Sequence, residues 1–292
     1  MQRYKLTVEY LGSAFRGFQA QPKESGLTVQ VELERALQRL VGGENLSRVV
    51  VSSRTDAGVH AIANTAHVDL RRTTPHAGHV VRNATNAFLR QRNVPIVVRD
   101  VEAVPSTFHA RFDAIGREYI YQIHMPKRAF RHAAPGCLPS TLFARNLSWH
   151  VEQPLDTDAM AAACTHFLGQ HDFTSFRGAK CQAPSPVRHL DTLSIETIAA
   201  HAADDLSEDD ATTLLHVKAA APSFLYHMVR NIVGTLVYVG CGRLQPEDVP
   251  RIFEARDRCA APEMAPAHGL YLRRVLYPSH SATNDGKPLM TT

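Results

Sequence analysis

Apolar and polar residues alternate along several short segments of this chain, beginning within its first ten residues. A period of two is typical of half-buried strands, because successive side chains then face opposite sides of a sheet. It predicts strands at residues 4–10, 48–52, 64–70 and 96–104. Apolar residues at helical spacing predict helices at residues 28–41 and 79–89. This is the element order of a split βαβ unit with an antiparallel sheet.

A similar order of elements follows in the rest of the chain. Strands are predicted at residues 119–124, within 187–198, and at 212–218 and 270–276, with helices at 158–168 and 222–239. Asp158 or Thr157 is expected to cap the first of these helices.

We therefore predict an α+β fold in which two split-βαβ, ferredoxin-like subdomains share a central antiparallel sheet. A cleft between the subdomains would be wide enough for a large ligand. The expected boundaries are residues 1–106, with the motif described below, and residues 107–280, followed by a tail at 281–292.

Composition excludes several classes of protein. A hydrophobic share of 44% and a charged share of 21% fit a globular chain rather than a disordered one. The apolar run at residues 232–239 is too short to span a membrane, and no signal-peptide pattern precedes the first strand, so we expect a cytoplasmic protein with no membrane contact. The five cysteines and 16 histidines form no metal-binding motif, and no nucleotide-binding or Gly-x-Ser-x-Gly motif occurs.

Positive charge is concentrated in the first half of the chain. Residues 1–150 hold 20 Lys and Arg against 11 Asp and Glu, whereas residues 151–292 hold 12 against 17. Of the 32 basic residues, 26 are Arg, whose planar guanidinium binds phosphate with two donors and stacks on bases. This distribution favours a nucleic-acid partner, although an Arg-rich genomic composition would produce the same bias.

The densest polar motif follows the strand at residues 48–52. Arg54 and Asp56 lie two positions apart in a loop, and loops held by rigid scaffolds often carry chemistry. Gly58 follows them, and without a Cβ it lets the backbone bend or a ligand approach. Taken alone, the pattern more often marks an ordinary turn with a solvated Arg.

Two other segments carry residues suited to the same site. Tyr119 lies on a predicted strand beside Arg-rich sequence, where a tyrosine can stack on a base, move a proton or fill the core. Arg230 lies within the apolar face of a predicted helix, where a buried Arg needs a partner. We predict that Asp56 is this partner and that the pair lowers the pKa of Asp56, which keeps a nucleophile ionised. Alternatively, Arg230 extends to solvent.

Five blocks of sequence, in this order, resemble the tRNA pseudouridine synthase family that acts on the anticodon arm: residues 53–61, 108–119, 172–176, 227–234 and 269–272. The resemblance implies that Asp56 is the nucleophile and that Arg54 enters the RNA stack to extrude the target uridine. It implies that Tyr119 stacks on the flipped base and that Arg230 pairs with Asp56. Leu270, in the last block, is expected to contact the substrate.

The same resemblance implies that uridine is isomerised to pseudouridine without a metal or organic cofactor. It also implies a homodimer that binds tRNA across both subunits. Residues 52–53, 184–188 and 265–270 look closer to a eukaryotic branch of the family, for which a mitochondrial or nuclear location is also open.

Two other functions remain as alternatives. One is an RNA-binding or tRNA chaperone protein on the same fold without catalysis. The other is a nucleosidase that releases free uracil, although the sequence lacks the second carboxylate that such chemistry usually uses.

Overall fold

A nine-stranded sheet runs through the protein, seen in a computed structural model that describes residues 1–21, 26–126, 144–198 and 212–278. Its main path, in spatial order, consists of β4 (Ile96–Val104), β1 (Gln2–Tyr10), β3 (His60–Leu70), β11 (Leu270–Leu276), β5 (Gly116–Pro126), β10 (Thr212–Ala221) and β9 (Thr192–Ile198). Two short strands pair at its sides: β2 (Val50–Val51) with β3, and β6 (Trp149–His150) with β5. A separate two-stranded sheet consists of β7 (Gly169–Asp172) and β8 (Val187–Leu190).

Neighbours along the main path are antiparallel except at one place. There β11 runs parallel to β3, with Tyr271 opposite His60. On each side of this junction the last strand in sequence lies beside the first: β4 beside β1, and β11 beside β5. The predicted α+β architecture with a mainly antiparallel central sheet is thus confirmed.

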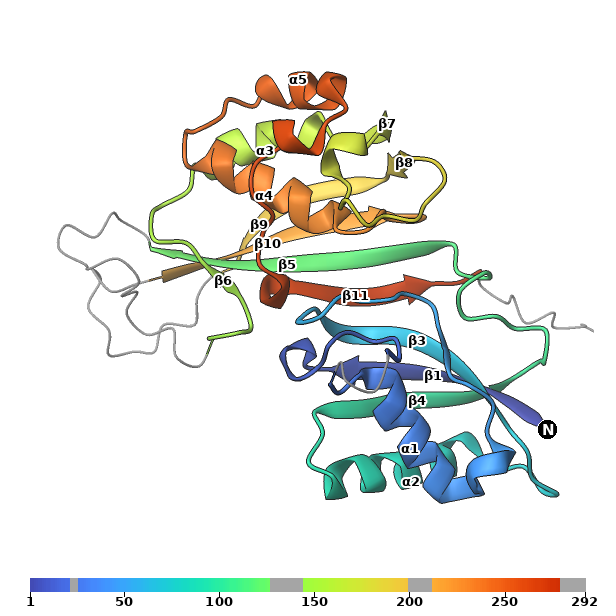
Figure 1. The fold of residues 1–292 in the computed structure, drawn as a ribbon. Helices are drawn as coiled ribbons and strands as arrows, with labels where there is room; N and C mark the ends of the chain where they lie inside the picture. The colour runs from blue at the N-terminus through green and yellow to red at the C-terminus, as the bar shows by residue number, and fades with distance from the viewer. Residues whose placement is uncertain (22–25, 127–143, 199–211, 279–292) are drawn as a thin grey trace, which may run out of the picture.

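Helices cover the sheet in two groups (Figure 1). The first group is α1 (Val29–Val41) and α2 (Gly78–Gln91), which lie beside β4, β1 and β3. The second group is α3 (Thr157–Thr165), α4 (Met228–Gly240) and α5 (Asp248–Ala255), on the side of β10 and β9. Each group closes a hydrophobic cluster, one containing Leu6 and Leu33 and the other containing Ile123 and Ile232. Among the described residues, no helix has the length and apolar character needed to cross a membrane.

The helix predicted from Pro222 begins later, at Met228. His227 precedes it with a φ of 64°, in the left-handed region, which a right-handed helix does not accommodate. Residues 222–227 therefore form a turn that leads into α4, and this turn becomes part of the site described below.

Other differences have simple local causes. The cap of α3 is Asp156, whose carboxylate accepts hydrogen bonds from the backbone nitrogens of Asp158 and Ala159, so neither Asp158 nor Thr157 caps it. The segment 187–198 divides at Asp191, because its two halves pair with different strands, β7 and β10. The strand predicted at 48–52 is only two residues long, and α5 was not predicted. The predicted tail at 281–292 lies outside the described residues.

Candidate active site

A cavity of about 750 Å³ lies where the loop between β2 and β3 meets β5, β11 and the start of α4. Its lining includes all five site residues predicted from the sequence: Arg54, Asp56, Tyr119, Arg230 and Leu270. They come from four separate segments, so the fold brings together groups up to 216 positions apart. The predicted residues thus belong to one site.

The loop that carries Asp56 is fixed by hydrogen bonds to β1, to β3 and to the segment that follows β1. The hydroxyls of Thr55 and Tyr10 lie 2.7 Å apart, and the carbonyl of Thr55 accepts from the backbone N–H of Phe18 at 3.2 Å. Within β3, the side chain of Asn64 donates to the carbonyl of Ser53 at 2.9 Å. Because these neighbours are buried, the loop presents Asp56 in a defined position.

Two glycines allow this close packing. Gly58 has a φ of 81°, a conformation that other residues rarely adopt, which confirms the bend expected there. A Cβ on Gly12 would lie 1.9 Å from the carbonyl oxygen of Val59, so only glycine fits where the two loops touch. The turn after Asp56 therefore depends on the segment that follows β1.

Asp56 and Arg230 approach each other as predicted. The Nη1 atom of Arg230 lies 3.8 Å from the Oδ2 atom of Asp56, a separation typical of an ion pair but too long for a hydrogen bond. Arg230 is only 9% exposed, and its Nε donates to the carbonyl of Ala265 at 2.8 Å. Arg230 therefore does not extend to solvent, and this alternative is wrong.

The net pKa of Asp56 is raised, not lowered as the pair with Arg230 alone predicts. Burial of the carboxyl group raises the pKa of Asp56, and the positive charge of Arg230 only partly offsets this increase. Arg230 thus acts in the expected direction, but the loss of solvation is the larger effect. The Asp56 carboxylate is less stable, and more readily protonated, than a solvated aspartate.

Tyr119 lies on β5, between Leu272 of β11 and Ala219 of β10. Its ring meets the ring of Phe224 edge to face, with centroids 5.1 Å apart. Burial raises the pKa of Tyr119 to about 12, while a hydrogen bond with the Ser53 side chain acts against this shift. At neutral pH the hydroxyl therefore keeps its proton.

His227 is a member of the site that the sequence did not reveal. Its Nε2 atom lies 3.4 Å from the Oδ2 atom of Asp56. Burial, together with the charges of Arg230 and Arg258, lowers the pKa of His227 to about 4, so its ring is neutral at neutral pH. A histidine beside an apolar helix carries no sequence signal for this contact, because the contact depends on the left-handed turn at this residue.

The turn at His227 has a matching recess on the neighbouring segment. The ring of Tyr226 stacks on that of His227 with centroids 3.6 Å apart. A Cβ on Gly178 would lie 2.7 Å from the Tyr226 ring and 2.9 Å from the Nδ1 atom of His227. The backbone N–H of Gly178 also donates to the carbonyl of Tyr226 at 2.8 Å. Gly178 therefore leaves the space that both rings occupy.

The cavity wall is strongly cationic. Among its described lining residues there is one carboxylate, Asp56, against six basic side chains: Arg54, Arg111, Arg117, Lys180, Arg188 and Arg230. Arg54 is exposed at the cavity, whereas Leu270 is 5% exposed at the start of β11. Such a wall suits a polyanionic ligand. Within the described ranges, no group of three or more His, Cys, Asp or Glu side chains is placed to hold a metal ion.

A model of the tRNA pseudouridine synthase family matches residues 6–113 and 163–278. The chain belongs to the tRNA pseudouridine synthase family. Four predicted site residues fall within the matched ranges, and Tyr119 falls between them. Tyr119 is therefore assigned to the site by its position in the cavity and not by this match.

Several curated relatives span almost the whole chain. The tRNA pseudouridine synthase A of Allorhizobium ampelinum is 42% identical over 281 residues, covering 96% of each protein. That of Paramagnetospirillum magneticum is 40% identical over 277 residues, covering 95% of this chain and 96% of the relative. That of Rhodospirillum centenum is 42% identical over 277 residues, covering 95% of this chain and the whole relative. These bacterial relatives lend no support to the expected likeness to a eukaryotic branch of the family.

Proposed function

We propose that this chain is a tRNA pseudouridine synthase that isomerises uridine in the anticodon stem-loop, with Asp56 as its nucleophile. The observation that carries the proposal is the position of Asp56: a partly buried carboxylate beside Arg230 in a cationic cavity. The names of the relatives, which share at least 40% of their residues with this chain, support the choice of tRNA as substrate.

In the proposed reaction the glycosidic N1–C1′ bond of the uridine breaks, the uracil turns, and its C5 joins C1′. C5 loses its proton and N1 gains one, so the overall composition does not change. The Asp56 carboxylate adds to a substrate carbon, either ring C6 or sugar C1′, and leaves again before the product forms. The charge of Arg230 favours the ionised form that this step needs.

Tyr119 and Leu270 would contact the base that enters the cavity. The Tyr119 hydroxyl, protonated at neutral pH, can donate a hydrogen bond to a uracil carbonyl or to an atom that gains negative charge. Its ring and the Leu270 side chain supply apolar surface for the flat faces of the base.

The target base must leave its stack before Asp56 can reach it. Extrusion costs a few kcal/mol of stacking and pairing free energy. Arg54 is exposed and close in sequence to Asp56, so it is suited to fill the vacated position in the RNA. The cationic wall would hold the phosphates, and binding should therefore weaken as salt increases.

At a larger scale, we infer that residues 1–106 and 107–280 form two split-βαβ subdomains with the substrate cleft between them. Their separate hydrophobic clusters and the similar strand neighbours on each side of the β3–β11 junction support this division. The family resemblance supports a homodimer that binds tRNA across both subunits. A tRNA substrate also favours a cytoplasmic location.

A catalytically silent tRNA-binding protein would need the same cationic wall but not Asp56. The burial of Asp56 disfavours that alternative, because it costs free energy that Arg230 only partly offsets and that RNA binding alone does not require.

The deciding experiment incubates the protein with uridine-containing tRNA and maps pseudouridine at single-nucleotide resolution. Asp56→Asn should yield no product while still binding tRNA. Asp100→Asn, at an exposed position of β4 outside the cavity, should remain fully active. Binding without product in the wild type would support the silent RNA-binding protein, and free uracil would support a nucleosidase.

A further inference from the structure

A large aromatic side chain stands exposed at the wall of the cavity. Phe112 is 76% exposed, yet it also lines the cavity that contains Asp56. It belongs to the loop between β4 and β5, beside the cationic side chain of Arg111. A single exposed apolar residue needs no explanation in itself, so what matters is how the loop holds it.

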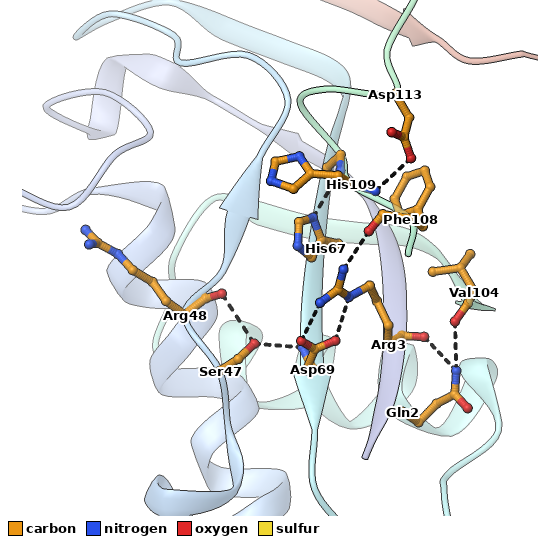
Figure 2. Close-up of polar contacts among 11 residues, drawn as sticks. Gln2, Arg3, Ser47, Arg48, His67, Asp69, Val104, Phe108, His109 and Asp113 are labelled. Carbon is orange, nitrogen blue, oxygen red and sulfur yellow. Dashed lines mark hydrogen bonds and ion pairs between the residues drawn. The ribbon is translucent and has the colours of Figure 1, made fainter. Parts of the chain in front are cut away.

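The base of this loop is anchored to β1 and β3, as Figure 2 shows. Arg3 forms a two-bond ion pair with Asp69, with both N–O distances at 2.7 Å, and donates from Nη1 to the carbonyl of Phe108 at 2.8 Å. From β3, the Nδ1 atom of His67 accepts a hydrogen bond from the backbone N–H of Ala110 at 3.0 Å.

The tip of the loop is fixed by its own side chains. The Nδ1 atom of His109 accepts from the backbone N–H groups of Arg111 and Phe112, each at 3.2 Å. Asp113 in turn accepts from the backbone N–H of His109 at 2.8 Å (Figure 2). An ordered loop that holds an apolar ring in solvent has already lost the entropy that binding would otherwise cost.

The ring of Phe112 is contacted by two side chains of its own loop. His109 stacks on it at 4.3 Å between centroids with a 29° interplanar angle, and the guanidinium carbon of Arg111 lies 5.8 Å from its centroid. With three quarters of its surface still exposed, the side chain has room for another flat group.

We propose that Phe112 is a stacking platform for a nucleobase of the substrate RNA outside the target uridine, and that Arg111 contacts a phosphate next to that base. This inference rests on the proposed function, because it assumes that RNA enters the cavity. Aromatic rings interleaved with cations are the surface that single-stranded or looped RNA recognises, and the cavity wall has six cations to one carboxylate. The platform would hold the RNA while the target base reaches Asp56.

The test measures tRNA affinity and pseudouridine formation for Phe112→Ala and Phe112→Trp. Loss of one base stack should weaken tRNA binding roughly tenfold to a hundredfold in Phe112→Ala, at constant salt, whereas Phe112→Trp should bind at least as well as the wild type. Ile115→Ala is the matched control, since Ile115 is 56% exposed in the same loop but does not line the cavity. Its affinity should not change.

Two further measurements separate stacking from charge. The chain has a single Trp, so the fluorescence that Phe112→Trp adds over the wild type reports on position 112 and should be quenched when tRNA stacks there. Removal of Phe112 should leave the salt dependence of binding unchanged, whereas Arg111→Gln should reduce its slope by about one phosphate contact.

Each outcome decides between explanations. Equal tRNA affinity in Phe112→Ala and the wild type, or no quenching in Phe112→Trp, would overturn the platform while leaving the synthase function intact. A dimer that dissociates in Phe112→Ala would assign the ring to a second copy of the chain instead. Weakened tRNA binding in Phe112→Ala, when the wild type makes no pseudouridine, would retain the platform and reject the synthase.

Discussion

The neutral ring of His227 lies beside Asp56, with its Nε2 atom 3.4 Å from the Oδ2 atom of the carboxylate. Arg230 approaches the same oxygen at 3.8 Å. At neutral pH the carboxylate therefore meets one cation and one uncharged ring, because burial lowers the pKa of His227 to about 4. When Nε2 of the neutral ring carries the proton, it can orient the carboxylate without the extra charge that would weaken Asp56 as a nucleophile.

This contact predicts that His227 positions Asp56. His227→Leu removes the ring nitrogen that faces Asp56 and keeps water out, so kcat should fall roughly tenfold to a hundredfold with little change in KM for tRNA. The low-pH side of the pH–rate profile of this variant should move to higher pH, because a carboxylate that loses a polar neighbour is protonated more easily. His227→Gln keeps a polar N–H group at this position. In a single-turnover assay it should retain most of the wild-type rate that His227→Leu loses. Equal rates and pH profiles in both variants would show that His227 serves packing only.

A second prediction concerns the positive charge of Arg230 beside Asp56. Arg230→Met replaces the cation with an apolar side chain, so the pKa of Asp56 should rise further and the acid limb of kcat/KM should move to higher pH. Arg230→Lys keeps the charge and should leave that limb near its wild-type position. If both variants keep the wild-type limb, the charge of Arg230 does not act on the group that controls the rate.

Much of the fold was predictable because periodicity and local signals agree. The strands at 96–104 and 270–276 match β4 and β11, and the helix at 28–41 begins one residue before α1. Prediction was incomplete where tertiary pairing decides, as in the segment 187–198, which holds two strands, β8 and β9. The parallel contact of β11 with β3 joins strands some 200 positions apart, and no local pattern contains it.

The sequence predicted most members of the site but not its energetics. Arg54, Asp56 and Arg230 were identified from residue type and context, and all line one cavity. The sequence could not reveal that burial outweighs the charge of Arg230 at Asp56, since that balance depends on how much solvent the folded chain excludes. Nor could it reveal His227, whose contact needs both its left-handed backbone and the space left by Gly178.

Gly12 gives a steric prediction about the Asp56 loop. In Gly12→Ala the new Cβ would lie 1.9 Å from the carbonyl oxygen of Val59, so the loop must move away and the free energy of unfolding should fall by about 1–3 kcal/mol. Pseudouridine formation should fall as well, because Val59 follows Asp56 closely. Gly43→Ala is the control, since a Cβ there meets nothing within 4 Å. Comparable losses in the two variants, by thermal denaturation and by rate, would refute the steric explanation.

His67 should contribute to the change of protein stability with pH. Its Nδ1 atom accepts a hydrogen bond from the backbone N–H of Ala110. Burial is the main cause that lowers the pKa of His67 to about 4, so the folded state holds the ring neutral while the unfolded chain protonates it near pH 6.5. The contribution of His67 to stability is therefore complete above pH 6.5 and is lost as the pH falls toward 4, up to about 3 kcal/mol. His67→Gln cannot titrate but can still accept the hydrogen bond. Urea unfolding from pH 7 to 4 should show a shallower loss of stability in this variant, and an identical slope would contradict the assignment.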